Sequence, residues 1–223
     1  GSSSGEDDSE VVGPIFMETP CGPYTAPYSY DVEDIDYSND NRIGECWSLG
    51  ENDNYRWYID NSNNYERTYE PYSAKRGQRY YRSSIYNYSS NTSSTSTLIT
   101  PDIDISSLTD PVLDFYTFIN GDNVGSLHVD VYSNGSWTDD VLVLTGKQQE
   151  DSRDLWAQQL VDLSDYGDVI KVRFRAISGT GTGRSEINID DINVVERPSC
   201  LDPTDIIASN ITYQSVDLSW TSN

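Results

Sequence analysis

The sequence predicts an all-β protein built as a two-sheet antiparallel jelly-roll sandwich. Three observations lead to this fold class. Apolar and polar residues alternate in several segments after residue 97, which is typical of half-buried strands. Glycine, asparagine, aspartate and proline separate these segments at short intervals, as turns do in sandwiches and barrels. No window of useful length shows the periodicity of an amphipathic helix.

The clearest strands follow one another through the second half of the chain. Segment 111–119 starts at a proline and has apolar residues on both of its faces, as expected for a strand inside a sandwich. Ile103 and Ile105 share one face of an earlier, shorter strand. The inward-facing residues expected in two later strands are Leu127, Val129 and Val131, then Ile170, Val172, Phe174 and Ala176.

The segment INIDDINVV (187–195) changes phase once, at Asp190 and Asp191. The apolar residues before the break share one face of the strand, and those after it share the other. Such a slip by one residue is the signature of a β-bulge. Two adjacent carboxylates at a bulge need a cation, backbone N–H donors or water, because burying an unpaired charge is costly.

The composition excludes several partners. Acidic residues outnumber basic ones by 37 to 14, for a formal net charge of -23. A chain with this charge repels nucleic acid and anionic membrane surfaces, so neither is an expected partner. No segment is apolar enough for a membrane span, so no direct membrane insertion is expected. The excess of carboxylates indicates a solvated acidic surface, binding of divalent cations, or both.

The three cysteines are Cys21, Cys46 and Cys200. Their spacing and the presence of a single histidine argue against a zinc site. Cys21 and Cys46 either form a short-range disulfide, which would suit an oxidising compartment, or remain two buried thiols. Cys200 lies at a change in composition and is the odd cysteine of the three.

Composition divides the chain into three parts. Residues 1–20 join an opening GSSSG, which resembles an expression tag, to an acidic lead-in expected to be flexible. Residues 21–197 carry the strand pattern of the sandwich. Residues 198–223 start with a proline-flanked linker and continue into a new alternation that ends on Trp220, which predicts the start of a second β domain, cut short.

Residues 48–97 differ from the rest because they are rich in tyrosine, asparagine, serine and arginine. Strands are expected around 55–59 and 83–88, and the remainder is expected to form long loops, which often carry function. Aromatic faces beside amides and charged groups suit sugar binding, and arginine can reach acidic sugars or sulfates. Alternatively, the rings fill cross-strand pairs. The candidate ligand-binding residues are Tyr55, Trp57, Tyr80, Tyr81 and Arg82.

Five short motifs occur in order along the chain: TPDIDIS, PVLDFY, GSLHVDV, a tryptophan followed by VDLS, and IDDI. With these motifs, residues 27–196 resemble a MAM domain, the family named after meprin, A5 protein and receptor phosphatase mu. The resemblance implies a jelly-roll fold, a secreted or cell-surface location and a role in adhesion. The chain departs from the family at Val32, where an aromatic residue is usual, and the family's paired-cysteine pattern is incomplete.

The tail resembles the first two strands of a fibronectin type III domain, with Trp220 at the core position. Pairs of these two kinds of module are typical of secreted or surface multidomain proteins. The resemblance therefore implies neighbouring domains in a larger chain and an accessory or adhesive role.

Two pairs of carboxylates are candidate metal ligands: Asp31 with Glu33, and Asp190 with Asp191. The first and last strands of a sandwich are often close, so the two pairs are expected to converge. Carboxylate oxygens are the ligands that Ca²⁺ prefers, and the resemblance implies a cation near the acidic first strand. The sequence therefore predicts Ca²⁺ as a cofactor. The alternative is that these carboxylates are solvated and cap turns.

No catalytic constellation stands out in the sequence. His128 is the only histidine; it points away from the core of its strand, with Asp130 on the same face. Without a Gly-x-Ser-x-Gly motif, this pair predicts a surface histidine instead of a catalytic triad. The chain is expected to be a non-catalytic extracellular module that binds a glycan or a cell-surface protein. The alternative is a non-catalytic appendage or spacer domain of a secreted peptidase or glycosidase.

Overall fold

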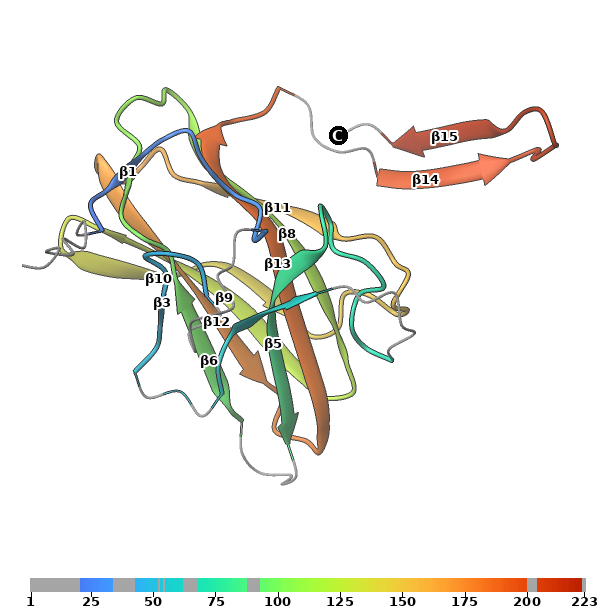
Figure 1. Cartoon of the computed structure of the whole chain (residues 1–223), viewed down its shortest axis with the longest axis horizontal. Helices are drawn as coiled ribbons and strands as arrows, with labels where there is room; N and C mark the ends of the chain where they lie inside the picture. The colour runs from blue at the N-terminus through green and yellow to red at the C-terminus, as the bar shows by residue number, and fades with distance from the viewer. Residues whose placement is uncertain are drawn as a thin grey trace, which may run out of the picture.

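The structure is a computed structural model, and it describes residues 21–33, 43–51, 53, 55–61, 68–87, 93–199 and 204–221. These residues form fifteen β-strands and no helix (Figure 1). Thirteen of the strands build two facing sheets, which confirms the predicted all-β jelly-roll sandwich. The tag and lead-in over 1–20 and the odd cysteine, Cys200, lie outside the described residues.

The first sheet has seven strands in the order β1-β7-β12-β6-β3, and β9 joins β12 to β10 on one side. The pairs are antiparallel except for the parallel pair β1–β7. The strands of this sheet are β1 (Tyr24–Thr25), β3 (Ser48–Leu49), β6 (Thr95–Ile99), β7 (Ile103–Asp104), β9 (Val124–Ser133), β10 (Ser136–Thr145) and β12 (Val169–Ser178).

The second sheet has six strands in the order β11-β8-β13-β5-β4, and the short strand β2 also pairs with β13. All of its pairs are antiparallel. The strands of this sheet are β2 (Tyr28–Tyr30), β4 (Tyr58–Asn61), β5 (Arg79–Asn87), β8 (Pro111–Gly121), β11 (Ala157–Asp162) and β13 (Gly183–Glu196).

The core lies between the two sheets, where the predicted alternation directs its apolar residues. Ile103 and Ile105 are buried, as are the inward-facing residues predicted for β9 and β12. Phe115 of β8 meets Phe174 of β12 edge to face across the two sheets, with ring centroids 5.2 Å apart. Each fully buried side chain of this size contributes about 1.5–3 kcal/mol to folding, so the interface between the sheets dominates stability.

The bulge predicted at Asp190 and Asp191 is confirmed. Strand β13 advances from Asp190 to Asn193 while its neighbour β8 advances only from Tyr116 to Asp114. Asp191 takes a positive φ of 48°, a left-handed conformation that aspartate tolerates better than most residues. The slip lets Ile189 and Ile192 both face the core, although the number of residues between them would place them on opposite faces.

The tyrosine-rich region differs from the prediction in its strand boundaries. The structure places β4 at Tyr58–Asn61 and β5 at Arg79–Asn87, whereas strands were expected around 55–59 and 83–88. Strand β5 starts earlier than expected because its first residues, Arg79–Arg82, pair with β4, while residues 81–87 pair with β13. Its alternation was hidden in the sequence because polar, charged and aromatic residues occupy its outer positions.

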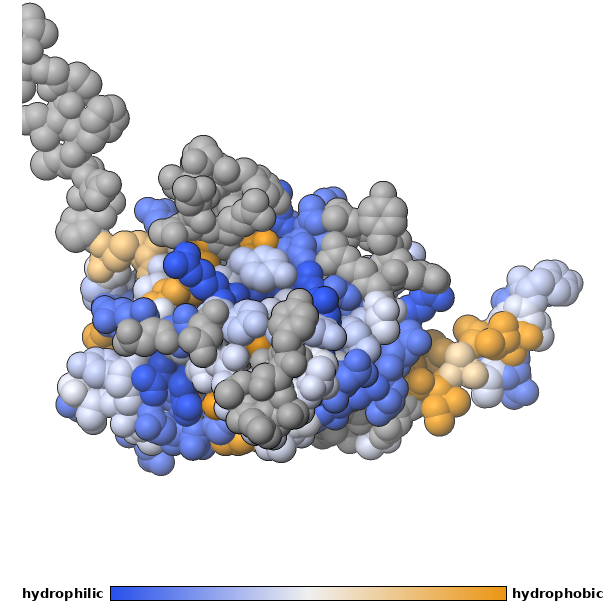
Figure 2. All heavy atoms as spheres, turned by 90° about the horizontal axis from the view of Figure 1, so that it is seen from below, coloured by the Kyte–Doolittle hydropathy of each residue, from blue (hydrophilic) through white to orange (hydrophobic). Residues whose placement is uncertain are grey.

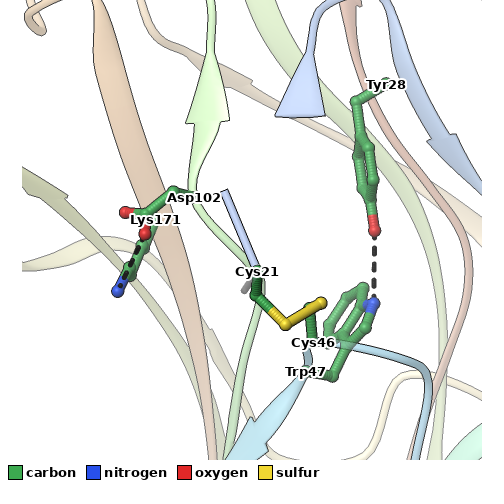
Figure 3. The surroundings of a disulfide bond; sticks show 6 residues. All are labelled: Cys21, Tyr28, Cys46, Trp47, Asp102 and Lys171. Atoms are coloured by element: carbon green, nitrogen blue, oxygen red, sulfur yellow. Dashed lines mark hydrogen bonds and ion pairs between the residues drawn. A yellow bond between two sulfur atoms is a disulfide. The ribbon is translucent and has the colours of Figure 1, made fainter. Parts of the chain in front are cut away.

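Cys21 and Cys46 form a disulfide, with their Cα atoms 5.7 Å apart, which decides between the disulfide and the two buried thiols (Figure 3). Beside the bond, Trp47 is buried and donates a hydrogen bond from Nε1 to the hydroxyl of Tyr28, at 3.2 Å. The disulfide therefore joins the start of the sandwich to the loop before β3, next to an aromatic part of the core.

The strands β14 (Thr204–Ser209) and β15 (Asp217–Thr221) form a hairpin of their own that projects from the sandwich (Figure 1). Apolar side chains gather on this hairpin, while the visible face of the sandwich is mostly hydrophilic (Figure 2). Ile207, Leu218 and Trp220 are more than half exposed. A two-stranded sheet with an uncovered apolar face has little stability of its own.

Candidate functional site

Three of the four predicted metal ligands, Glu33, Asp190 and Asp191, contact one segment, residues 75–79, which precedes and enters β5. We call Asp31, Glu33, Asp190 and Asp191 the acidic corner. One oxygen of Asp190 accepts hydrogen bonds from the backbone N–H groups of Lys75 (2.9 Å) and Arg76 (3.3 Å). Its other oxygen accepts from the backbone of Asp191 at 2.8 Å. The segment 75–79 therefore packs against the bulge of β13.

Glu33 and Asp191 hold the same segment, whereas Asp31 accepts a hydrogen bond from the backbone of Glu33 at 3.2 Å. Glu33 accepts hydrogen bonds from the backbone N–H groups of Gln78 and Arg79, each at 2.7 Å. A Cβ atom at Gly77, where φ is +63°, would lie 2.4 Å from the Glu33 carboxylate, so this position requires glycine. Asp191 forms an ion pair with Arg76 at 3.2 Å. The carboxylates beside the first and last strands were predicted to converge, and Glu33 and the bulge of β13 do meet at residues 75–79.

Burial raises the pKa of Asp190 to about 8, although backbone hydrogen bonds favour its charged form. Burial also raises the pKa of Asp191, and the charge of Asp31 adds to this effect while Arg76 opposes it. Three cations lie among these carboxylates: Arg76 pairs with Asp191, Lys75 also lowers the pKa of Asp191, and the guanidinium of Arg79 donates a hydrogen bond to the backbone carbonyl of Glu33. Among the described residues, no three histidine, cysteine, aspartate or glutamate side chains are grouped so that they could hold a metal ion.

Two of the predicted ligand-binding residues belong to the core instead. Trp57 and Tyr81 are 1% and 0% exposed. The indole of Trp57 donates a hydrogen bond to the backbone of Ser96 at 2.9 Å, and the ring of Tyr81 packs against those of Tyr30 and Trp47. Neither ring offers a face to a ligand. The sequence suggested binding because aromatic residues are equally common in cores and in sugar sites.

The other three predicted residues, Tyr55, Tyr80 and Arg82, lie on or beside the outer face of the second sheet. Tyr80 is buried there against Trp156, with ring centroids 5.7 Å apart. Tyr55 is half-buried, and its hydroxyl donates a hydrogen bond to the backbone of Tyr86 at 3.1 Å. The outer face thus combines covered aromatic residues with partly exposed ones.

Arg82 is the centre of an ion-pair network on this outer face. Its guanidinium contacts Glu186 at 2.9 Å, Asp60 at 2.6 Å and Glu70 at 2.5 Å. Arg184 contacts the same oxygen of Glu186 that receives a hydrogen bond from the hydroxyl of Ser84. Because Glu186 is fully buried, the two guanidinium groups compensate its charge. Arg82 is therefore occupied by protein carboxylates, which leaves it unsuited to acidic sugars or sulfates.

A second network on the outer face of the first sheet was not found from the sequence. Asp130 of β9 is fully buried and lies opposite Arg173 of β12. Its oxygens accept hydrogen bonds from Arg173 (2.6 Å), Arg175 (2.7 and 2.9 Å) and the backbone of Asp140 (2.8 Å). The alternation of β12 did show that both arginines point outward, but it could not show which acidic residue they meet.

The structure aligns Ser126, His128 and Asp140 in the order of a catalytic triad. One ring nitrogen of His128 lies 2.7 Å from Ser126 Oγ, and the other lies 2.7 Å from Asp140 Oδ1. Ser126 itself lies inside β9 and pairs with both β10 and β12. Its neighbours in the sheet therefore take up the backbone N–H groups that an oxyanion would need. Arg175 also binds Asp140 Oδ1, at 2.6 Å, so His128 shares this carboxylate oxygen with a permanently charged guanidinium group.

Ser126→Ala is expected to leave the hydrolysis of p-nitrophenyl acetate unchanged. Without an oxyanion site, a serine, histidine and aspartate lack the main source of transition-state stabilisation. Release of p-nitrophenolate by the wild type and the variant measures this directly. Labelling of the wild type by a fluorophosphonate probe provides a second readout. Labelling that disappears in Ser126→Ala would show a reactive serine and contradict the expectation.

The geometry defines a β-sandwich module that has an internal disulfide and carries an ion-pair network on each of its two outer faces. Residues 37–201 match the family model described as MAM domain, meprin/A5/mu. The chain therefore belongs to the MAM domain family. A comparison with curated proteins finds no significant match. Within the described residues, no helix is long and apolar enough to cross a membrane.

Solved structures of similar fold include two adhesin domains and a carbohydrate binding module. The K1 cleaved adhesin domain of Lys-gingipain from Porphyromonas gingivalis is 18% identical, with 77% of this chain and 98% of that chain covered and a TM-score of 0.49. The K2 cleaved adhesin domain of Lys-gingipain is 16% identical, with 76% of this chain and 98% of that chain covered and a TM-score of 0.50. The C-terminal family 22 carbohydrate binding module of Clostridium thermocellum Xyn10B is 11% identical, with 82% of this chain and 100% of that chain covered and a TM-score of 0.46. At these identities the likeness concerns the fold alone.

Proposed function

We propose that this chain is a non-catalytic extracellular module for adhesion and carbohydrate binding, stabilised by calcium. Membership of the MAM family carries the proposal, because MAM domains are extracellular. The disulfide between Cys21 and Cys46 supports it, since disulfides persist in oxidising compartments. The net charge of -23 also suits a soluble module that avoids nucleic acid and anionic membranes.

The proposed partners are a glycan or a cell-surface protein. Tyr86 supports this, because its ring is partly exposed on a face that also carries hydrogen-bonding side chains. The test is a glycan array probed with the whole chain, together with light scattering at high protein concentration to detect self-association. Binding to a glycan or to a second copy would support the proposal. A monomer that binds no glycan would favour the alternative, a spacer domain of a secreted hydrolase.

Calcium binding at the acidic corner is the second part of the proposal. The support is the contact of Glu33, Asp190 and Asp191 with one segment and the charge of Asp31 close to Asp191, with burial acting against the charge of Asp190. A divalent cation would offset this charge through oxygen ligands of the kind that Ca²⁺ prefers. The two side chains of the bulge would be its anchors.

A calcium concentration a hundred times the dissociation constant is expected to stabilise the fold by about 2.7 kcal/mol, because the ion binds only the folded chain. For a chain of this length, this corresponds to a rise in Tm of about 5–10 °C over the value in EDTA. The rise should disappear in Asp191→Ala. A thermal melt followed by circular dichroism measures both effects.

The control for this experiment is Asp165→Ala, which removes an exposed carboxylate away from the acidic corner. It should keep the full response to calcium. Equal Tm values in calcium and EDTA for the wild type would contradict a calcium site. An equal response in Asp191→Ala and the wild type would place the ion elsewhere.

Residues 198–223 are proposed as the start of a fibronectin type III-like domain that follows the sandwich. The support is the isolated β14–β15 hairpin with its alternating Leu218 and Trp220. Both side chains are exposed, although alternating apolar residues normally cover a core. A neighbouring domain built on this hairpin would bury them.

A further inference from the structure

The outer face of the second sheet is arranged in rows across its central strands. Strand register places Tyr86 beside Arg184, Glu186 between Ser84 and Asn120, and Asn188 between Arg82 and Phe118. Charged and amide groups thus fill the middle of the face. Aromatic side chains are found at both of its ends.

The two ends of this face differ in exposure. At one end Tyr80 is 1% exposed and is covered by Trp156. At the other end the ring of Tyr86 is 38% exposed, and Tyr55 and Tyr69 are half-buried beside it. Accessible aromatic rings are therefore concentrated near the end of β5 and the start of β13.

These rings form one patch with two polar partners. We call Tyr55, Tyr69, Tyr86, Arg184 and Asp122 the tyrosine patch. Tyr55 donates a hydrogen bond to the backbone of Tyr86, and the hydroxyl of Tyr69 donates one to Asp122. The guanidinium of Arg184 lies 5.8 Å from the ring centroid of Tyr86. The hydrogen bond to Asp122 raises the pKa of Tyr69, and both Arg184 and Tyr86 lie close enough to affect it.

The charges around the patch disfavour an anionic ligand. Arg184 is bound to the fully buried carboxylate of Glu186 at 3.0 Å. Arg82, the next arginine on this face, is shared by three carboxylates. Asp122 adds a further negative charge at the patch itself, on a chain with a net charge of -23. An uronate or sulfate would meet a negative surface whose nearest guanidinium group, that of Arg184, already has its charge paired with Glu186.

Hydrogen-bonding capacity remains unused in the middle of this face. Asn120 and Asn188 are both buried, yet Nδ2 of Asn120 and Oδ1 of Asn188 have no partner among the described residues. Buried amides are normally satisfied by protein or by ordered water. The face thus holds a buried donor and a buried acceptor that ordered water can satisfy, while the flat sides of the tyrosine rings at its end suit the C–H face of a sugar.

We propose that the tyrosine patch is the glycan-binding site of this chain and that it takes an uncharged pyranose unit of a neutral polysaccharide. The inference rests on the proposed carbohydrate-binding function and adds to it the place of the site and the class of ligand. Tyr86 stacks on the sugar ring. Arg184 donates hydrogen bonds to its hydroxyl groups, and Asp122 accepts them.

The test is native gel electrophoresis of the whole chain in gels that contain galactan, xylan or agarose, with polygalacturonate as the acidic comparison. The wild type should be retarded by at least one neutral polysaccharide and not by polygalacturonate. Tyr86→Ala should weaken the retardation about tenfold, since losing a stacked ring removes a principal contact.

Tyr24→Ala is the matched control, because Tyr24 is 37% exposed and lies in the first sheet. It should be retarded as strongly as the wild type. Tyr69→Ala provides a second test at a residue outside the strands, in case Tyr86→Ala disturbs β5. A thermal melt of each variant shows whether it is folded.

The outcomes separate the site from the function. Retardation of the wild type by a neutral polysaccharide, unchanged in Tyr86→Ala and Tyr69→Ala, would overturn the site and leave the proposed function standing. Retardation by polygalacturonate alone would overturn the ligand class. A wild type retarded by none of the four polysaccharides would contradict the inference together with the carbohydrate-binding function.

Discussion

Replacing Arg82 with methionine is expected to lower the free energy of unfolding by about 3–5 kcal/mol at neutral pH. The variant would leave Glu186, Asp60 and Glu70 together without the cation that they share. Glu186 is fully buried and would keep only Arg184 and Ser84 as partners, so its charge would be less well compensated away from water. Urea unfolding followed by tryptophan fluorescence measures the loss.

Two further variants show whether charge causes this loss. Arg82→Met combined with Glu186→Gln should lose less stability than Arg82→Met alone, because the buried charge is removed as well. Arg197→Gln is the exposed counterpart. Its guanidinium pairs with Asp110 and Asp162 in solvent, so the expected loss of stability is much smaller than that of Arg82→Met. Similar losses in Arg82→Met and Arg197→Gln would contradict a stabilising role for the buried network.

Replacing Asp130 with asparagine is expected to lower the free energy of unfolding by about 2–4 kcal/mol at neutral pH. Asparagine keeps the shape of the side chain but removes the charge that holds Arg173 and Arg175 together. The two guanidinium groups would then repel each other across the face of β12. Their partial exposure limits the loss, since water still reaches both of them. The same urea unfolding experiment applies.

The contribution of Asp130 depends on pH in a defined window. Burial alone would raise the pKa of its carboxyl group, but hydrogen bonds from Arg175, Asp140 and Arg173 outweigh burial and hold the pKa at about 2. An unfolded aspartate has a pKa of about 3.9, so the stabilisation is complete above this value and is lost as pH falls through about 2. The difference in stability between the wild type and Asp130→Asn should therefore shrink between about pH 4 and pH 2.

Asp139→Asn is the control within the same network. Asp139 is exposed and pairs only with the outer nitrogen of Arg173 among the ion pairs of the described residues, at 2.8 Å. Its replacement should cost about 0–1 kcal/mol. If Asp130→Asn differs from the wild type by the same amount at neutral and at acidic pH, the ion pairs of Asp130 are not the source of its effect.

Much of the fold could be predicted from alternation alone. In β12 the residues from Ile170 to Ala176 alternate strictly, and each inward position is buried. The break at Asp190 and Asp191 predicted a bulge for the same reason, since a strand directs successive side chains to opposite faces. Strand β5 was harder to place, because Arg82 and Tyr80 occupy outer positions that most strands leave to simpler polar residues.

The candidate sites were predictable only in part. The sequence showed that Trp57, Tyr80 and Tyr81 are aromatic, but not that all three are buried by residues distant in the chain. It placed His128 and Asp130 on one face of β9, but Asp140 reaches His128 only because β10 pairs with β9 and takes a positive φ of 61° at Asp140. The exposed Tyr86 could not be told apart from its buried neighbours.

By itself, the sequence determined the all-β class, the jelly-roll sandwich, the inward and outward residues of the long strands and the position of the bulge. These are local properties, because the geometry of a strand fixes which side chains share a face. The tertiary structure alone decided which carboxylate each arginine meets, which tyrosines remain accessible and how the acidic corner closes around residues 75–79. Those contacts join segments as far apart as Lys75 and Asp190, and only the pairing of distant strands and the packing of the loops over them bring such residues together.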